Sequence, residues 1–271
     1  MVVEACVVAI DLAFTVLLTW LAIPVGHSYH YWAPFLLLIA GYLLGMLIMW
    51  CVLFLFALPV NRKKKYTKPM KWANFWLTES IAYICNHGTK CRVKVHYNEP
   101  LPNERFLLVC NHISKFDPMV LTKLYGHRGL AFISKPTNFK IPIGGRFMVG
   151  DCYLSIDRYD KLQSLQVMND AAELIKNDYM SVGVFPEGTR SLDGTLGNFH
   201  EGVFSIAKKA KCPIVVMTVK DTIKIHENFP FKKTRVKFDL LKVLYPEDYE
   251  NKITKQISDE VYQMMYNNLY N

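Results

Sequence analysis

A histidine and an aspartate lie five residues apart directly after a short apolar run. His112 and Asp117 belong to Asn111-His112-Ile113-Ser114-Lys115-Phe116-Asp117-Pro118. A carboxylate that holds an imidazole fixes its tautomer and raises its basicity, so this pair suits general-base catalysis near neutral pH. Aspartate before Pro118 is also typical of a helix start, so helix capping is the alternative role of Asp117.

Cations and a turn follow three other predicted strands: Lys135 after residues 130–134, Arg158 after 153–156, and Phe185-Pro186-Glu187-Gly188-Thr189-Arg190-Ser191 at the end of 181–185. The planar guanidinium of Arg190 matches phosphate oxygens, and Gly188 lets backbone N–H groups approach them. Taken singly, Lys135 and Arg158 are ordinary solvated charges. Together with His112 at a fourth strand end, the three cations predict a phosphate site beside a base.

From residue 90 onward, short β-rich runs alternate with helical patterns. The predicted strands are 92–97, 106–110, 130–134, 153–156, 181–185, 214–219 and 235–243, and the predicted helices are 118–125, 161–176, 202–211 and 253–269. This order predicts an α/β fold with a mixed, partly parallel sheet flanked by helices. Ligands of such sheets bind beyond the carboxyl ends of the strands.

Two long apolar stretches precede this region. Residues 5–23 contain one charge, Asp11, residues 33–58 contain none, and a short turn at 24–32 joins them. Crossing a bilayer takes about 20 helical residues, so residues 1–60 are predicted to form a two-helix membrane anchor that spans the bilayer or lies in one leaflet. Basic residues from Arg62 onward mark the cytoplasmic side of a membrane span. The sequence therefore predicts an integral membrane protein whose catalytic domain lies on the cytosolic face.

Residues 61–90 are basic and aromatic, and Trp72, Phe75, Trp76 and Tyr83 recur at helical spacing. This pattern fits a helix in the lipid headgroup layer and equally an ordinary packed helix. Residues 91–271 are then the α/β domain that contains the candidate site.

Composition narrows the class of protein. Of 271 residues, 51% are hydrophobic and 20% are charged, which excludes a disordered chain. Glu4 and Asp11 are the only charged residues before Arg62, so residues 62–271 hold 32 Lys and Arg against 21 Asp and Glu. This surplus fits anionic lipid headgroups, and no nucleic-acid motif accompanies it. The seven scattered cysteines predict reduced thiols and no metal site.

Taken together, these segments resemble the glycerolipid acyltransferase family, most of all the 1-acylglycerol-3-phosphate acyltransferases. Four blocks of that family occur in order across roughly residues 105–220: Asn111-His112-x4-Asp117, the segment from Lys135 through Ile141-Pro142-Ile143-Gly144 to Ile156-Asp157-Arg158, residues 185–191, and Cys212-Pro213-Ile214-Val215-Val216. Two positions depart from the pattern. Val216 stands where the family usually has a proline, and His200 stands where it usually has a lysine. These two changes would affect the preference for acceptor or donor.

The resemblance implies an acyltransferase without a cofactor, using acyl-CoA or acyl carrier protein as the thioester co-substrate. It would acylate the free sn-2 hydroxyl of lysophosphatidic acid, a membrane lipid, to give phosphatidic acid. His112 would take the hydroxyl proton, with Asp117 orienting it. The glycerol phosphate would be positioned by Glu187, Gly188, Thr189 and Arg190, with Lys135 and Arg158 adding charge.

Two alternative functions are consistent with some of these residues. An enzyme of the same class would act on a different lysophospholipid acceptor. A membrane-bound protein that only binds anionic lipid would use the basic residues but would need neither His112 nor Asp117.

Overall fold

The computed structural model describes residues 2–22, 33–191 and 193–271, and its chain divides into two compact units, Met1–Pro59 and Val60–Asn271. The predicted turn at 24–32 lies outside the described residues. Each unit has its own helices, and the second contains the whole sheet.

The first unit is a pair of helices, α1 (Val2–Ala22) and α2 (Ala33–Ala57). Glycines on α2 permit close contact between them: a Cβ at Gly41 would lie 2.9 Å from Asp11 Oδ1, and one at Gly45 would lie 3.4 Å from the carbonyl oxygen of Val7. The charge of the first apolar stretch therefore faces α2. Among the described residues, Leu38–Ala57 is a helix long and apolar enough to cross a membrane.

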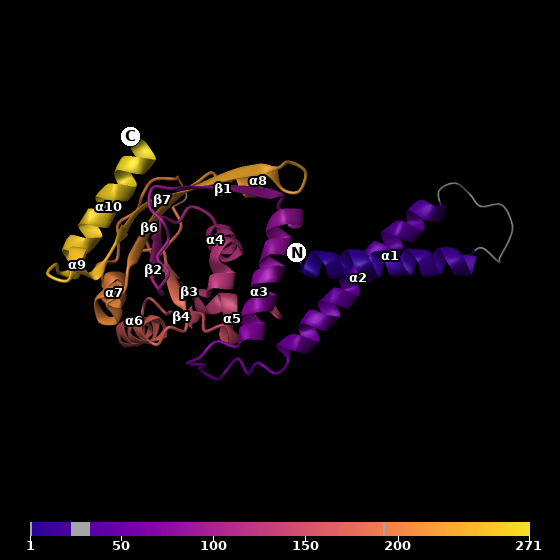
Figure 1. Cartoon of the computed structure of the whole chain (residues 1–271), viewed down its shortest axis with the longest axis horizontal. Coiled ribbons are helices and arrows are strands. Elements are labelled where there is room, and N and C mark those ends of the chain that lie inside the picture. The colour runs from indigo at the N-terminus through magenta and orange to yellow at the C-terminus, as the bar shows by residue number, and fades with distance from the viewer. Residues whose placement is uncertain (1, 23–32, 192) are drawn as a thin grey trace. The chain divides into compact units, whose positions relative to one another are not determined.

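The second unit is built on a seven-stranded sheet of order β1-β7-β6-β2-β5-β3-β4 (Figure 1). The strands are β1 (Cys91–Tyr97), β2 (Leu107–Cys110), β3 (Leu130–Ser134), β4 (Leu154–Ser155), β5 (Ser181–Val184), β6 (Ile214–Lys220) and β7 (Thr234–Leu244). All neighbouring strands are parallel except β6 and β7. The predicted mixed, partly parallel sheet is confirmed, and most of its strand pairs are parallel.

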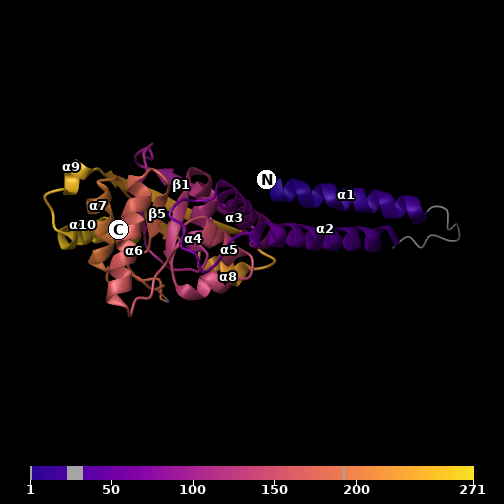
Figure 2. The ribbon, with the colours of Figure 1, turned by 90° about the horizontal axis from the view of Figure 1, so that it is seen from below.

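Helices flank this sheet on both sides (Figures 1 and 2). One group is α3 (Lys71–Tyr83), α4 (Asp117–Tyr125) and α5 (Gly144–Gly150), and the other is α6 (Lys161–Lys176), α7 (Ser205–Ala210) and α10 (Thr254–Tyr270). The central strands β2 and β5 are buried along their whole length, as their uninterrupted apolar runs require. Their ends are therefore fixed in a rigid frame.

The predicted elements agree with this frame, with some differences at short segments. The predicted helix 202–211 is a 3-10 turn, η5 (Glu201–Phe204), followed by the short α7. The 3-10 turns η3 (Gly126–Arg128) and η4 (Pro136–Lys140), and the helices α5, α8 (Lys224–Asn228) and α9 (Pro246–Tyr249), have too few residues for a periodic pattern. They were not predicted for that reason.

The aromatic helix α3 continues into a π-helical turn, η2 (Ile84–Gly88), and packs on the rest of the second unit. Ala73 and Leu77 are buried, and the ring of Trp72 meets that of Phe147 edge-on at 6.2 Å. Asn74 Nδ2 donates hydrogen bonds to the carbonyl oxygen of Gly126 (3.0 Å) and to Asp151 Oδ2 (3.1 Å). The packed-helix alternative accounts for these contacts.

Candidate active site

The predicted site residues follow four strands that are neighbours in the sheet. Strands β2, β5, β3 and β4 are adjacent and parallel, so their carboxyl ends lie at one edge. His112 follows β2, the turn 185–191 follows β5, Lys135 follows β3 and Arg158 follows β4. The topology thus brings a histidine and three cations to the same edge.

His112 and Asp117 are hydrogen-bonded to each other. His112 Nδ1 lies 2.8 Å from Asp117 Oδ2, and the imidazole is 16% exposed while the carboxylate is fully buried. With Nδ1–H donating to the carboxylate, Nε2 is the basic nitrogen of the ring. The imidazole also stacks on Phe185, with ring centroids 4.2 Å apart and planes at 20°. Both contacts hold the ring in one orientation.

The buried carboxylate of Asp117 accepts hydrogen bonds at both oxygens. Oδ2 also accepts the backbone N–H groups of Ile113 (2.8 Å) and Ser114 (2.7 Å), and Oδ1 accepts the hydroxyl of Thr222. The helix-cap alternative is therefore wrong. The carboxylate turns back to the loop before α4, and the N-cap position, Phe116, has no side-chain cap.

Glu187 joins the loop after β5 to the loop after β2. Its Oε1 accepts the His112 N–H (2.6 Å), and its Oε2 accepts the Gly197 N–H (2.9 Å). A further bond runs from the Ser191 N–H to the carbonyl oxygen of His112 (2.8 Å). Burial raises the pKa of Glu187, against the opposing effect of the two N–H donors. These contacts fix the backbone of both loops, including the loop that carries Arg190.

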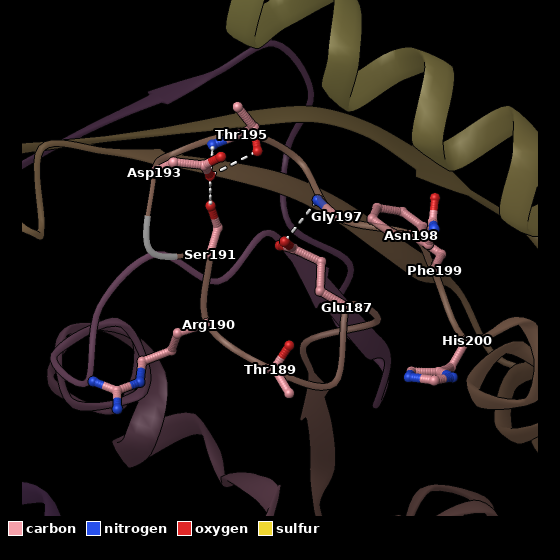
Figure 3. A pocket seen from close by; sticks show the side chains of 10 residues that line it. All are labelled: Glu187, Thr189, Arg190, Ser191, Asp193, Thr195, Gly197, Asn198, Phe199 and His200. Carbon is pink, nitrogen blue, oxygen red and sulfur yellow. Dashed lines mark hydrogen bonds between the residues drawn. The ribbon is translucent and has the colours of Figure 1, made fainter.

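An open pocket of about 410 Å³ lies over the 187–200 segment (Figure 3). Arg190 and His200 lie at opposite sides of the view, and Thr189 lies between them. The upper rim is a turn in which Asp193 Oδ1 accepts both the hydroxyl (2.7 Å) and the N–H (3.0 Å) of Thr195 and the hydroxyl of Ser191 (2.8 Å). These bonds, those of Thr195 first, lower the pKa of Asp193 to about 2.

Arg158 and His200 converge on Gly188. Gly188 adopts φ +70°, and a Cβ there would lie 2.9 Å from His200 Nε2 and 3.9 Å from Arg158 Cζ. Glycine is therefore required both for its left-handed backbone and for the space it leaves. Lys135 is exposed at the end of β3, between the strands that carry the turn 185–191 and Arg158.

Three supporting residues were not predicted as part of the site. Thr222 is fully buried and donates to Asp117 from 105 residues away. Asn111 Oδ1 accepts the Val219 N–H (2.7 Å) and its Nδ2 donates to the Val219 carbonyl oxygen (3.2 Å), which fixes the end of β2 against β6. Phe185 is the third. Asn111 and Phe185 lie inside quoted motifs, whereas no sequence signal marks Thr222.

Comparison with known proteins identifies relatives of this arrangement. The model of the family described as Acyltransferase matches residues 92–220, which contain every predicted site residue. A 1-acyl-sn-glycerol-3-phosphate acyltransferase of Chlamydomonas reinhardtii is 35% identical over 149 residues, 55% of this chain and 43% of that protein. The enzyme of that name from Saccharomyces cerevisiae is 30% identical over 150 residues, 54% of this chain and 49% of its own.

A solved structure has the same fold. The crystal structure of the 1-acyl-sn-glycerophosphate (LPA) acyltransferase PlsC from Thermotoga maritima aligns with a TM-score of 0.54 at 22% identity, covering 73% of this chain and 82% of the other. In the curated relatives the matched segment is shorter: the chain spans less than half the length of the first relatives it matches.

Proposed function

We propose that this protein, whose residues 92–220 match the model of the acyltransferase family, transfers a fatty acyl group from a thioester to the free sn-2 hydroxyl of lysophosphatidic acid, giving phosphatidic acid. The observation that carries the proposal is the His112–Asp117 pair at the strand edge that also bears Arg190 and Arg158. The names of the relatives support this choice of acceptor.

In the proposed reaction His112 is the general base. Nε2 takes the proton from the acceptor hydroxyl as its oxygen attacks the thioester carbonyl carbon. The tetrahedral intermediate collapses with cleavage of the carbon–sulfur bond, and the imidazolium returns the proton to the leaving thiolate. Asp117 stabilises the imidazolium and keeps its Nδ1–H directed at the carboxylate. The stacked Phe185 limits rotation of the ring.

The acceptor phosphate is assigned to the pocket over residues 187–200. Arg190 and Thr189 are exposed along its lining, and Arg158 lies near Gly188 at the same edge. A guanidinium binds phosphate oxygens through two parallel N–H groups, which ammonium groups do not offer. Lys135 then adds long-range attraction, and Glu187 holds the loop in place.

We further propose that residues 1–60 anchor the enzyme in the membrane, that 61–90 connect the anchor to the body, and that 91–271 are the catalytic domain on the cytosolic face. The apolar helix Leu38–Ala57 and the basic segment after it support this arrangement. Anchoring confines the enzyme and its lipid acceptor to the same two-dimensional phase.

Release of free thiol by the purified full-length protein tests the function, with acyl-CoA or acyl carrier protein as donor. Thiol release should depend on added lysophosphatidic acid, and His112→Ala should lower kcat by about a hundredfold or more, as expected for loss of a general base. His127→Ala is the matched control, because His127 Nε2 also pairs with a carboxylate, Glu79 Oε1 at 3.0 Å, outside the site.

Equal activity of the two histidine variants would remove His112 from the mechanism. A panel of lysophospholipids ranked by kcat/KM tests the acceptor. Preference for a zwitterionic headgroup would overturn lysophosphatidic acid as the substrate, and lipid binding without turnover of any donor would overturn the enzyme itself.

A further inference from the structure

The connection between β6 and β7 exposes two phenylalanines beside lysines. Phe231 is 85% exposed and Phe229 is 55% exposed, and Lys232 and Lys233 follow directly and are exposed as well. The connection runs from Asp221 to Lys233 and contains α8 (Figure 1). Isolated exposed apolar residues are common, but aromatic side chains flanked by lysines are typical of segments that enter a lipid interface.

Four more cations lie on the adjoining edge of the sheet. β1 and β7 are parallel, with Arg92 in register with Arg235 and Lys94 in register with Lys237, and all four side chains are exposed. Adjacent strands are roughly 4.8 Å apart, so these pairs bring like charges together on one face. An anionic partner would relieve this repulsion.

The charge of this region remains positive after its acidic residues are counted. Asp221 pairs with Lys224 (2.6 Å between Oδ1 and Nζ), and Glu227 is the other acidic residue of the connection. The three lysines of the connection leave it a formal charge of +1, and the four ladder cations, less Asp239 on β7, raise the total to +4. The surface is complementary to a layer of anionic headgroups.

The position of this surface matters for its partner. β6 is parallel to β2, so the connection after β6 leaves the sheet at the edge where His112 follows β2. β7 and β1 begin at that edge, because β7 is antiparallel to β6 and parallel to β1. The exposed phenylalanines, the ladder cations and the candidate active site thus share one edge of the sheet.

We propose that the 221–233 connection and the β1–β7 cations form a membrane-contact surface that docks on an anionic leaflet, with Phe229 and Phe231 inserted among the lipids. The inference rests on the proposed function only in that the acceptor is a lipid. Docking turns the active edge of the body toward the bilayer. Nucleic acid and acidic proteins match the charge, but neither provides an apolar layer for two phenylalanines.

Insertion is tested by a polarity-sensitive fluorophore on the full-length protein. The label is placed through Phe231→Cys, with Ile253→Cys as the matched control, because Ile253 is 64% exposed and lies before α10 in a different part of the body. Cys6 and Cys51 are first replaced by serine, since the other five thiols are buried. Vesicles of phosphatidylcholine, with or without phosphatidylglycerol, carry brominated lipid as quencher.

The label at position 231 should be quenched, more strongly in vesicles containing phosphatidylglycerol, and the label at 253 should not be. Equal quenching at both positions, or none at 231, would overturn the proposal. Cross-linking between two copies through position 231 would instead assign the surface to self-association.

Kinetics give an independent test. Lys232→Gln with Lys233→Gln should raise the apparent KM for acceptor in anionic vesicles by at least about fivefold, the factor for one lysine near such a surface. With a water-soluble short-chain acceptor, activity should stay unchanged, as it should for Ile253→Ser with either acceptor. Equal loss with the soluble acceptor would place the connection in the catalytic fold. If the wild-type protein were inactive in every assay, the proposed function would be refuted. The quenching result would still show whether the surface contacts the membrane.

Discussion

Replacing Thr222 by valine removes one hydroxyl from beneath the proposed catalytic pair. The Thr222 hydroxyl donates to Asp117 Oδ1, while Oδ2 accepts His112 Nδ1–H and two backbone N–H groups. Thr222 and Asp117 are both fully buried. Valine has nearly the same shape, so the change deprives Oδ1 of this donor without opening a large cavity.

The magnitude follows from the charge and burial of the carboxylate. A hydrogen bond to a charged group contributes about 1.5–3 kcal/mol, and a factor of ten in rate corresponds to about 1.4 kcal/mol. The carboxylate must stay fixed while the imidazolium forms, so we expect kcat to fall at least about tenfold. Thr222 does not line the pocket, so KM should change little.

Thr218→Val is the control for a generic buried hydroxyl. Thr218 is also fully buried on β6, but its Oγ1 donates to Asn268 Oδ1 (2.6 Å), on α10. Steady-state kinetics at a temperature where all variants are folded should show reduced kcat for Thr222→Val only. Thr222→Ser, which retains a hydroxyl, should recover most of the rate.

The reasoning would be refuted by either of two results. If Thr222→Val kept wild-type kcat, the hydroxyl would not matter to the pair. If, in both Thr218→Val and Thr222→Val, the loss of kcat followed the loss of unfolding free energy in the same proportion, Thr222 would contribute only to packing.

Two further predictions concern the fold around the site. Burial raises the pKa of Asp151 well above its usual value of 3.8, so the stabilisation of its protonated form is complete below about pH 4 and is lost as the pH rises toward the folded-state pKa. Urea unfolding should therefore show that Asp151→Asn is more stable than wild type at neutral pH. The difference in unfolding free energy should grow with pH by at most about 1.4 kcal/mol per pH unit. A difference that stays constant across pH would contradict this. Gly188 and Gly194 both have positive φ, but a Cβ at Gly188 would meet His200 whereas none of the described atoms lies within 4 Å of one at Gly194. Thermal unfolding and KM should show Gly188→Ala as the more harmful change, with partial recovery when His200→Ala is added; equal effects at the two glycines would show that only backbone strain matters.

The sequence was sufficient to predict the frame because its signals are local. Uninterrupted apolar runs such as Leu107–Cys110 predict buried strands, and the 161–176 pattern predicts its helix at the observed bounds. Chemistry at strand ends follows from the rule that parallel carboxyl ends share an edge. His112 and Arg190 could be predicted in this way to lie at one edge, whereas the adjacency of β2 and β5 that brings their loops together depends on the strand order.

The supporting contacts could not be predicted because they join distant segments. Threonine is common in turns, so its presence at position 222 gives no signal of a role in the site. The connection that carries Thr222 is placed only by the antiparallel pairing of β6 with β7. The family resemblance implied that Glu187 positions the glycerol phosphate, a role that stays a prediction. What the sequence could not predict is that its carboxylate accepts the N–H groups of His112 and Gly197, because these contacts depend on how two distant loops meet.

The acidic residues of the site are buried and its arginines are exposed. Asp117 and Glu187 are both buried, and their four oxygens accept hydrogen bonds from the imidazole, the Thr222 hydroxyl and backbone N–H groups. Their negative charge is thus directed at the protein's own loops, whereas Arg190 and Arg158 remain exposed at the same edge. In the proposed reaction an anionic acceptor would therefore meet the cations first, while the carboxylates hold the histidine and the arginine loop in place. If the pocket holds a phosphate as proposed, the two N–H groups that Glu187 accepts offset its charge toward that ligand, while the Arg190 guanidinium stays exposed.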